Sequence, residues 1–262
     1  MDRAKPHRII VNVLALAAWL AFYNFGFGAD GQFDNLLEQA TGAEVRGEVP
    51  KAIKLYEQAS LVQSNNAADL CALSKGYCNL TYLTDSAAVQ RDALKRAVNC
   101  AEQAVRIGPS NATAHASLAV CYARSCAFAD IKTQLAYSRL FKQEAEKTIA
   151  LDSKQDIAFY LLGRWNYEIA RVGFFSRAYV KLVYGGLPKA SYQEAISDFQ
   201  KAVSLAPARI IHHEGLAMAY QAAGEKDLAI KELEKCRALK PSDIADRESQ
   251  REALKRLEAL NR

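Results

Sequence analysis

The sequence predicts an all-α protein, built as a right-handed helical-repeat solenoid with insertions inside some repeats. Only 13 glycines and 6 prolines occur among 262 residues, which is few for a chain of short strands and tight turns. Half of the residues are apolar and 24% are charged, a composition that excludes bulk disorder. One pattern of small and large apolar residues also recurs five times, which indicates a repeat architecture.

The first 28 residues precede the repeats and have the layout of a targeting segment. Basic residues come first, an uncharged run follows over residues 9–29, and Gly26 and Gly28 stand near its end. This order is typical of a secretory signal peptide cleaved after Gly28. The run is also long enough for an uncleaved N-terminal membrane anchor, and a buried helix is a third alternative. We expect a protein that is exported (periplasmic or secreted) or membrane-anchored, rather than cytoplasmic.

The clearest repeat extends from His212 to Pro241. Its sequence is similar to the tetratricopeptide repeat, a helix-turn-helix of about 34 residues. Gly224 supplies the turn, because glycine tolerates left-handed backbone angles. Pro241 ends the second helix, because proline has no backbone N–H to donate. The positions that pack the two helices together are Leu216, Ala217, Tyr220, Ala229, Leu233 and Cys236.

Four earlier segments fit the same frame, so we expect about five helical hairpins over residues 29–241. In the first, Gly47 supplies a turn and Pro50 opens a helix, where its missing N–H is harmless. Each second helix needs a small buried residue at one position, and successive positions are 45, 44, 54 and 34 residues apart. Three units therefore carry insertions. The five small residues are Ala59, Ala104, Thr148, Ala202 and Cys236.

The longest insertion lies between the two helices of the fourth unit, and its residues 172–187 are too apolar for an ordinary loop. We expect either an extra short helix that packs back onto the solenoid or a helix that contacts a membrane or a partner. Ser191 and Glu194 then form a capping box for the next helix. For the second alternative, the contact residues would be Phe174, Phe175, Arg177, Tyr179, Lys181 and Tyr184.

The tail over residues 242–262 is charged on one face and apolar on the other. An open-ended solenoid needs a terminal element with a polar outer face. We therefore expect a C-terminal capping helix.

One segment carries a more specific resemblance. LLGRWNYEIA, with the insertion and helix that follow it, resembles the regulator of microtubule dynamics family. Gly163, Arg164 and Trp165 match the family's glycine-arginine-tryptophan motif, and residues 188–199 match the segment after its long insertion. The likeness covers about residues 30–262. It implies a non-enzymatic helical-repeat protein from a family whose eukaryotic members associate with microtubules and the spindle, some of them anchored in membranes by an N-terminal hydrophobic segment.

The sequence offers no motif for catalysis, a cofactor or a metal. It contains no phosphate-binding loop and no nucleophile elbow, and its histidines lack metal-ligand spacing. We expect His115 and His213 to be packing residues and the six cysteines to be buried thiols rather than a disulfide framework. Lys and Arg number 34 against 29 Asp and Glu and are dispersed, so nucleic acid is not an expected partner.

Function then depends on the concave surface that stacked repeats create. We expect a scaffold or adaptor that binds a protein partner in this groove, although a solvated face without a ligand is also possible. A membrane- or lipid-associated protein that uses the 172–187 insertion is the alternative. Arg164 and Trp165 lie about 100° apart on one helix, so we place Arg164 in the groove and Trp165 in the core. The predicted groove residues are Lys75, Asn79, Arg124, Tyr160, Arg164 and Tyr167.

Overall fold

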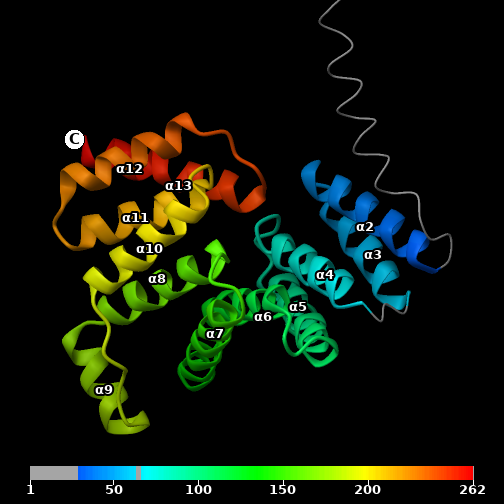
Figure 1. The fold of residues 1–262 in the computed structure, drawn as a ribbon, viewed down its shortest axis with the longest axis horizontal. Helices are drawn as coiled ribbons and strands as arrows, with labels where there is room; N and C mark the ends of the chain where they lie inside the picture. Colours follow the sequence, from blue (N-terminus) through cyan, green and yellow to red (C-terminus); the bar gives the residue numbers. More distant parts are fainter. Residues whose placement is uncertain (1–28, 63–65, 262) are drawn as a thin grey trace, which may run out of the picture.

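The computed structural model describes residues 29–62 and 66–261, and these ranges contain helices and no strand (Figure 1). The predicted signal peptide or anchor at residues 1–28 lies outside them. No helix within the described ranges is long and apolar enough to cross a bilayer. In chain order the helices are α2 (Ala29–Val45), α3 (Val49–Leu61), α4 (Ala67–Leu80), α5 (Ala87–Ile107), α6 (Ala112–Ser125), the 3-10 turn η1 (Cys126–Phe128), α7 (Ile131–Leu151), α8 (Asp156–Ala170), α9 (Phe174–Tyr184), α10 (Tyr192–Leu205), α11 (Ile210–Ala222), α12 (Lys226–Ala238) and α13 (Ile244–Leu260).

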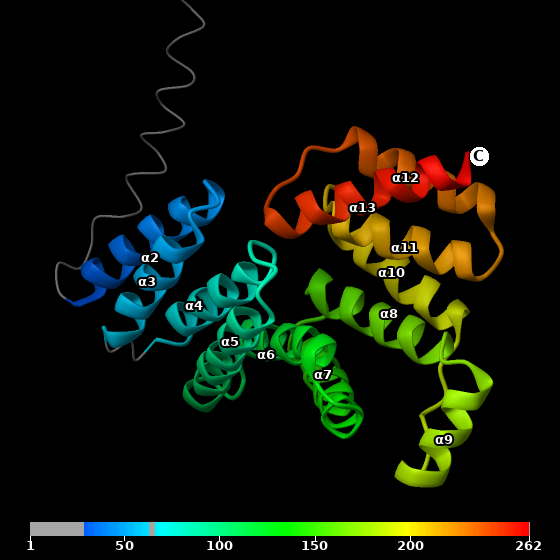
Figure 2. The same ribbon diagram turned by 180° about the vertical axis from the view of Figure 1, so that it is seen from behind.

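Antiparallel pairs are the unit of this fold. Helices α2 and α3, α4 and α5, α6 and α7, α8 and α10, and α11 and α12 pack against each other (Figures 1 and 2). The first helices also contact one another in sequence, α2 with α4, α4 with α6, α6 with α8, and α8 with α11. Helix α13 lies on α11 and α12 at the end of the array. This arrangement confirms the predicted all-α, tetratricopeptide-like solenoid.

The repeat register is confirmed by burial. All five small residues predicted to anchor the second helices have an exposed fraction of 0%. Gly224 has a φ of 84°, the left-handed angle that its turn requires. Pro50 lies in the first turn of α3. The spacing of small residues therefore located each helix pair correctly.

The inserted residues of the second and third units lengthen existing helices. Helices α5 and α7 contain 21 residues each, whereas α12 contains 13. In each of these long helices, a side chain caps the N-terminus. Ser86 accepts a hydrogen bond from the Val89 amide, and Asp130 accepts one from the Thr133 amide.

The insertion of the fourth unit forms a separate helix, α9, which ends at Gly185 with a φ of 82°. It projects from the rest of the array (Figures 1 and 2). Val180 is its one buried residue, while Phe174, Phe175 and Leu182 are exposed. The expectation that this apolar helix packs back onto the solenoid is therefore wrong for its apolar face, because no described element covers that face.

The core is held by close contacts between small and aromatic residues. Phe199 of α10 is fully buried, and Gly163 of α8 and Gly215 of α11 border its ring. A Cβ added at Gly163 would lie 2.8 Å from Phe199 Cδ1, and one added at Gly215 would lie 2.6 Å from Phe199 Cε1. These two glycines therefore let the fourth and fifth helix pairs approach across one ring.

The buried thiols pack in two other core clusters, one that contains Cys78 and Cys121 and one that contains Cys236. All six cysteines are free, and every one except Cys126 is buried. Cys78 Sγ and Cys121 Sγ lie 3.6 Å apart, and Ser74 Oγ lies 3.0 Å from Cys121 Sγ. Burial raises the pKa of the Cys100 thiol to about 11. The cysteines are thus packing residues, as the sequence predicted.

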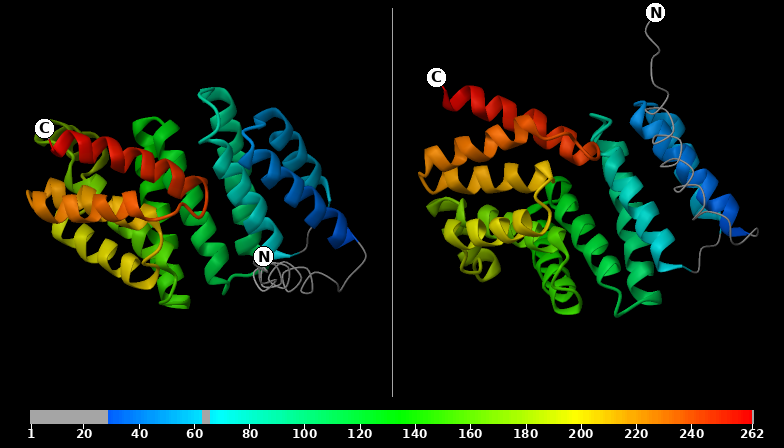
Figure 3. Two further views of the ribbon diagram at one scale, coloured as in Figure 1. Left: turned by 90° about the horizontal axis from the view of Figure 1, so that it is seen from above. Right: turned by 45° about the horizontal axis from the view of Figure 1, so that its top comes forward.

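The array curves so that its C-terminal part comes close to the second helix pair (Figure 3). The linker between α12 and α13 and the start of α13 lie beside α4, where Lys75 forms an ion pair with Asp243. This closure creates a cavity on the inner face of the array.

Candidate functional site: a polar cavity on the inner face

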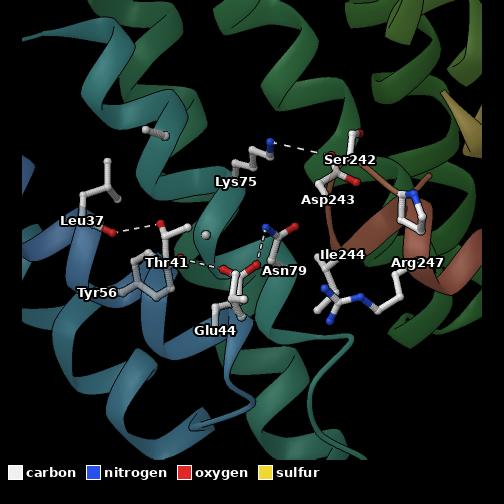
Figure 4. A pocket seen from close by; sticks show the side chains of 14 residues that line it. Leu37, Thr41, Glu44, Tyr56, Lys75, Asn79, Ser242, Asp243, Ile244 and Arg247 are labelled. Carbon is white, nitrogen blue, oxygen red and sulfur yellow. Dashed lines mark hydrogen bonds and ion pairs between the residues drawn. The ribbon is translucent and has the colours of Figure 1, made fainter. Parts of the chain in front are cut away.

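A cavity of about 380 Å³ lies where α2 and α4 meet the C-terminal segment (Figure 4). Its wall combines apolar side chains with charges from both ends of the array. Two of the predicted groove residues, Lys75 and Asn79, line it. The complete lining is Leu37, Thr41, Glu44, Val45, Tyr56, Ala72, Lys75, Gly76, Asn79, Pro241, Ser242, Asp243, Ile244 and Arg247.

Lys75 contributes a loosely held cation to this cavity. Its Nζ lies 3.9 Å from Asp243 Oδ2, and 65% of its side chain is exposed. Asp243 has a second and shorter ion pair, because Arg209 Nη2 lies 3.1 Å from the same oxygen. Exposed ion pairs of this kind stabilise a fold only weakly. Lys75 can therefore leave Asp243 for another carboxylate without leaving Asp243 unpaired.

Asn79 is held more firmly. Its Nδ2 donates to Glu44 Oε1 at 2.8 Å, and the Tyr56 hydroxyl donates to Glu44 Oε2 at 2.7 Å (Figure 4). Burial raises the pKa of Glu44, and these two hydrogen bonds oppose that shift. The three residues form one wall of the cavity, with their polar atoms largely committed to each other.

Arg124 lies farther along the inner row, at the end of α6. Its guanidinium stacks 3.9 Å above the centre of the Tyr82 ring and donates to the Thr81 hydroxyl. Its buried Nε has no hydrogen-bond partner among the described residues. The Tyr160 ring on α8 packs against His212 at 5.5 Å. Arg124 and Tyr160 were both predicted to face the groove, and the side chains of both contact neighbouring residues of the repeat array.

The three residues of the glycine-arginine-tryptophan motif have separate roles. Gly163 borders the Phe199 ring. The Trp165 ring is buried, donates from Nε1 to Ser138 Oγ at 3.0 Å and lies beneath Lys142. Arg164 lies on a different face of α8 from Trp165, and its guanidinium donates to Glu168 Oε1 at 3.0 Å. The assignment of Trp165 to packing is thus confirmed.

Arg164 also contacts the last repeat. Its Nη1 lies 3.4 Å from Met218 Sδ, and its guanidinium lies 6.0 Å from the Tyr167 ring centre. Burial raises the pKa of nearby Glu214, and the charges of Arg164 and Arg256 oppose that shift. These contacts form a second polar cluster on α8, α11 and α13, separate from the cavity that contains Lys75.

Sequence reasoning did not find the residues that the tail contributes. Asp243 and Arg247 line the cavity, and Arg256 lies 3.5 Å from Glu214. A charged amphipathic tail predicts a capping helix, but nothing in its sequence indicates that the start of this helix lies beside α4. The partner of Lys75 therefore depends on the curvature of the whole array.

The three histidines in the described part of the chain are structural, and two of them make the same clamp. His115 Nδ1 lies 2.5 Å from Glu144 Oε2, and its Nε2 lies 3.0 Å from the Pro109 carbonyl oxygen. The corresponding distances at His213 are 2.5 Å to Glu232 and 2.9 Å to the Pro207 carbonyl. Each clamp ties the two helices of a pair to the preceding loop. The packing role predicted for His115 and His213 is confirmed, with hydrogen bonds added.

A third histidine joins two repeats. His212 is fully buried, and its Nε2 lies 2.6 Å from Asp156 Oδ2. This hydrogen bond lowers the pKa of Asp156. Within residues 29–62 and 66–261, no three His, Cys, Asp or Glu side chains are grouped to hold a metal ion.

Stacked helix pairs with a continuous inner row of first helices define a tetratricopeptide-like helical-repeat protein. The chain resembles the crystal structure of a thermophilic TPR protein from Thermus thermophilus, with a TM-score of 0.59 over 85% of this chain and 98% of that one at 16% identity. Residues 31–261 match the family described as Regulator of microtubule dynamics protein 1-3, and the chain belongs to this family.

Two curated relatives show how low the sequence identity to members of this family is. The chain is 27% identical to regulator of microtubule dynamics protein 3 of Xenopus laevis, over 60% of this chain and 34% of that protein. It is 26% identical to regulator of microtubule dynamics protein 1 of Bos taurus, over 67% of this chain and 55% of that protein. The matched region therefore spans only about a third to a half of these relatives.

Proposed function

We propose that this protein is a non-enzymatic scaffold that binds an amphipathic segment of a partner protein on its inner face. The observation that carries the proposal is the cavity between α4 and the C-terminal segment, which combines apolar walls with an exposed lysine. Its lining offers an amphipathic segment both apolar surface to bury and charged groups to pair with. The family membership supports the scaffold class.

The site favours a partner segment that carries carboxylates beside apolar side chains. A carboxylate of the partner would replace Asp243 beside Lys75, and Arg209 would retain Asp243. Arg247 supplies a second cation at the same rim, while Leu37 and Ile244 supply apolar surface. Charge pairing then fixes the register of the segment, and apolar burial provides affinity.

The experiment is a binding titration with peptides selected from a random library on the full chain. We expect the selected peptides to combine acidic and apolar residues and to lose affinity for the Lys75→Glu, Arg247→Glu double variant. Lys51→Glu is the matched control, because Lys51 is similarly exposed but lies on α3. Because the relatives are named for microtubule dynamics, tubulin is the first protein to test in the same assay.

We also propose that the chain is exported or held at a membrane by its N-terminus. The basic start and the uncharged run over residues 9–29 support this proposal. The intact mass of the protein from its source cell tests it. Cleavage after Gly28, or recovery of the full chain from the membrane fraction, is expected, and a full-length soluble cytosolic product would contradict it.

A further inference from the structure

Helix α9 presents its apolar side chains to the outside of the molecule. Phe175 is 85% exposed and Leu182 is 86% exposed, and Phe174, Tyr179 and Val183 are also exposed. Phe175, Tyr179 and Leu182 are spaced by four and three residues, so they lie on one face of the helix. A contiguous apolar stripe of this kind on a surface marks an interaction site.

The stripe has a fixed direction because the opposite side of α9 is attached to the repeat array. Val180 is buried, and Arg177 Nη2 donates to the Ile169 carbonyl oxygen at the end of α8 at 2.6 Å. After α9, Leu187 packs against the core cluster that contains Trp165. Arg177 therefore orients α9, and the apolar stripe faces away from these attachments.

The charged residues around the apolar stripe indicate what kind of surface α9 binds. Between Glu168 and Glu194 the sequence contains no acidic residue, but it contains Arg171, Arg177, Lys181 and Lys189. An amphipathic helix with aromatic and leucine side chains beside basic ones is typical of a helix that lies in a membrane interface. Basic side chains near a bilayer are attracted to anionic headgroups.

We infer that α9 is a membrane-surface helix that inserts Phe174, Phe175, Tyr179 and Leu182 into the interface of an anionic bilayer. Lys181 and Lys189 would contact the headgroups. Insertion needs no rearrangement of the repeats, because the stripe is already exposed and α9 projects from the array (Figures 1 and 2). This surface is separate from the inner cavity, so the inference does not depend on the proposed partner binding.

The test is flotation of the full chain with vesicles of pure phosphatidylcholine or of equal parts phosphatidylcholine and phosphatidylserine. We expect stronger binding to the anionic vesicles and at least about a tenfold loss of it in the Phe175→Ser, Leu182→Ser double variant. Leu61→Ser is the matched control, because Leu61 is 81% exposed on α3. Circular dichroism must show equal melting temperatures, since all three side chains are exposed.

A local measurement separates α9 from the apolar run over residues 9–29, which every variant retains. Hydrogen exchange of the α9 amides, over residues 174–184, should slow when anionic vesicles are added. Unchanged exchange in α9, or equal flotation of the double variant and the wild type, would overturn the inference. A concentration-dependent dimer that is lost in the double variant without protection by vesicles would overturn it in favour of a second copy of the chain.

Discussion

Lys75 Nζ lies 3.9 Å from Asp243 Oδ2, although Lys75 belongs to the second helix pair and Asp243 precedes the last helix. This contact links the second helix pair to the C-terminal segment across the inner face. It is long and exposed, whereas Arg209 holds the same carboxylate at 3.1 Å. The link between the two ends of the cavity is therefore weak, which suits a site where a partner's carboxylate competes for the lysine.

Gly163→Ala should destabilise the protein by about 1–3 kcal/mol, because the added Cβ would lie 2.8 Å from the Phe199 ring. Gly163→Leu should cost at least as much. Gly31→Ala in α2 is the control, since an added Cβ there meets nothing within 4 Å. Urea unfolding of both variants measures the difference, and an unchanged free energy of unfolding for Gly163→Ala would refute the packing described for Phe199.

Trp165→Ala should destabilise the protein by about 3–5 kcal/mol, as loss of a buried aromatic side chain does. Arg164→Ala should cost only about 1 kcal/mol, because its ion pair with Glu168 is partly exposed. The contact between Arg164 and Met218 adds to this small cost. Thermal unfolding distinguishes the variants, and the reverse order would show that Arg164 is the structural residue.

His115→Ala and His213→Ala should each destabilise the protein by about 2–4 kcal/mol. Each change removes two hydrogen bonds and leaves a carboxylate without its buried partner. The two clamps belong to different helix pairs, so the double variant should cost the sum of the single variants. A strongly non-additive double variant would contradict the independence of the clamps.

Asp198 should make stability depend on pH. Burial raises the pKa of Asp198 to about 6, while the Asn166 side chain donates to it at 2.9 Å. Because this pKa is higher in the folded protein, the stabilisation from proton binding is present at low pH and is lost as the pH rises through about 6. An ionised Asp198 therefore destabilises the fold at neutral pH.

Asp198→Asn should raise the free energy of unfolding by about 1–2 kcal/mol at about pH 7.5, allowing for solvent screening of a half-buried group. The gain should shrink at about pH 4, where the folded wild type is already protonated. Asp227→Asn, at an exposed position on α12, is the control. A gain of equal size at both pH values would exclude the titration of Asp198 as its cause.

The repeat positions could be predicted from sequence because packing of paired helices requires small residues at fixed intervals. Ala59 and Cys236 are fully buried for this reason, and Gly163 and Pro50 have the local roles that their chemistry indicates. The placement of Lys75 beside Asp243 could not be predicted. It depends on how the small rotations between successive repeats add up along the array, and no local pattern encodes that sum.

The orientation of α9 was also beyond sequence reasoning. Hydrophobicity alone favoured packing against the array, since exposure of Phe175 and Leu182 to water is unfavourable. The hydrogen bond from Arg177 to the Ile169 carbonyl oxygen and the burial of Val180 decide otherwise. The polar contact at the end of α8 and the burial of Val180 together determine which face of α9 is presented.

Protein binding in the inner cavity can be measured by one titration. A fluorescent peptide selected on the wild-type chain is titrated with the wild type, with the Lys75→Glu, Arg247→Glu double variant and with Lys51→Glu. We expect an acidic, amphipathic peptide whose affinity falls at least about tenfold in the double variant and is unchanged in the control. Equal affinity for all three proteins would contradict it.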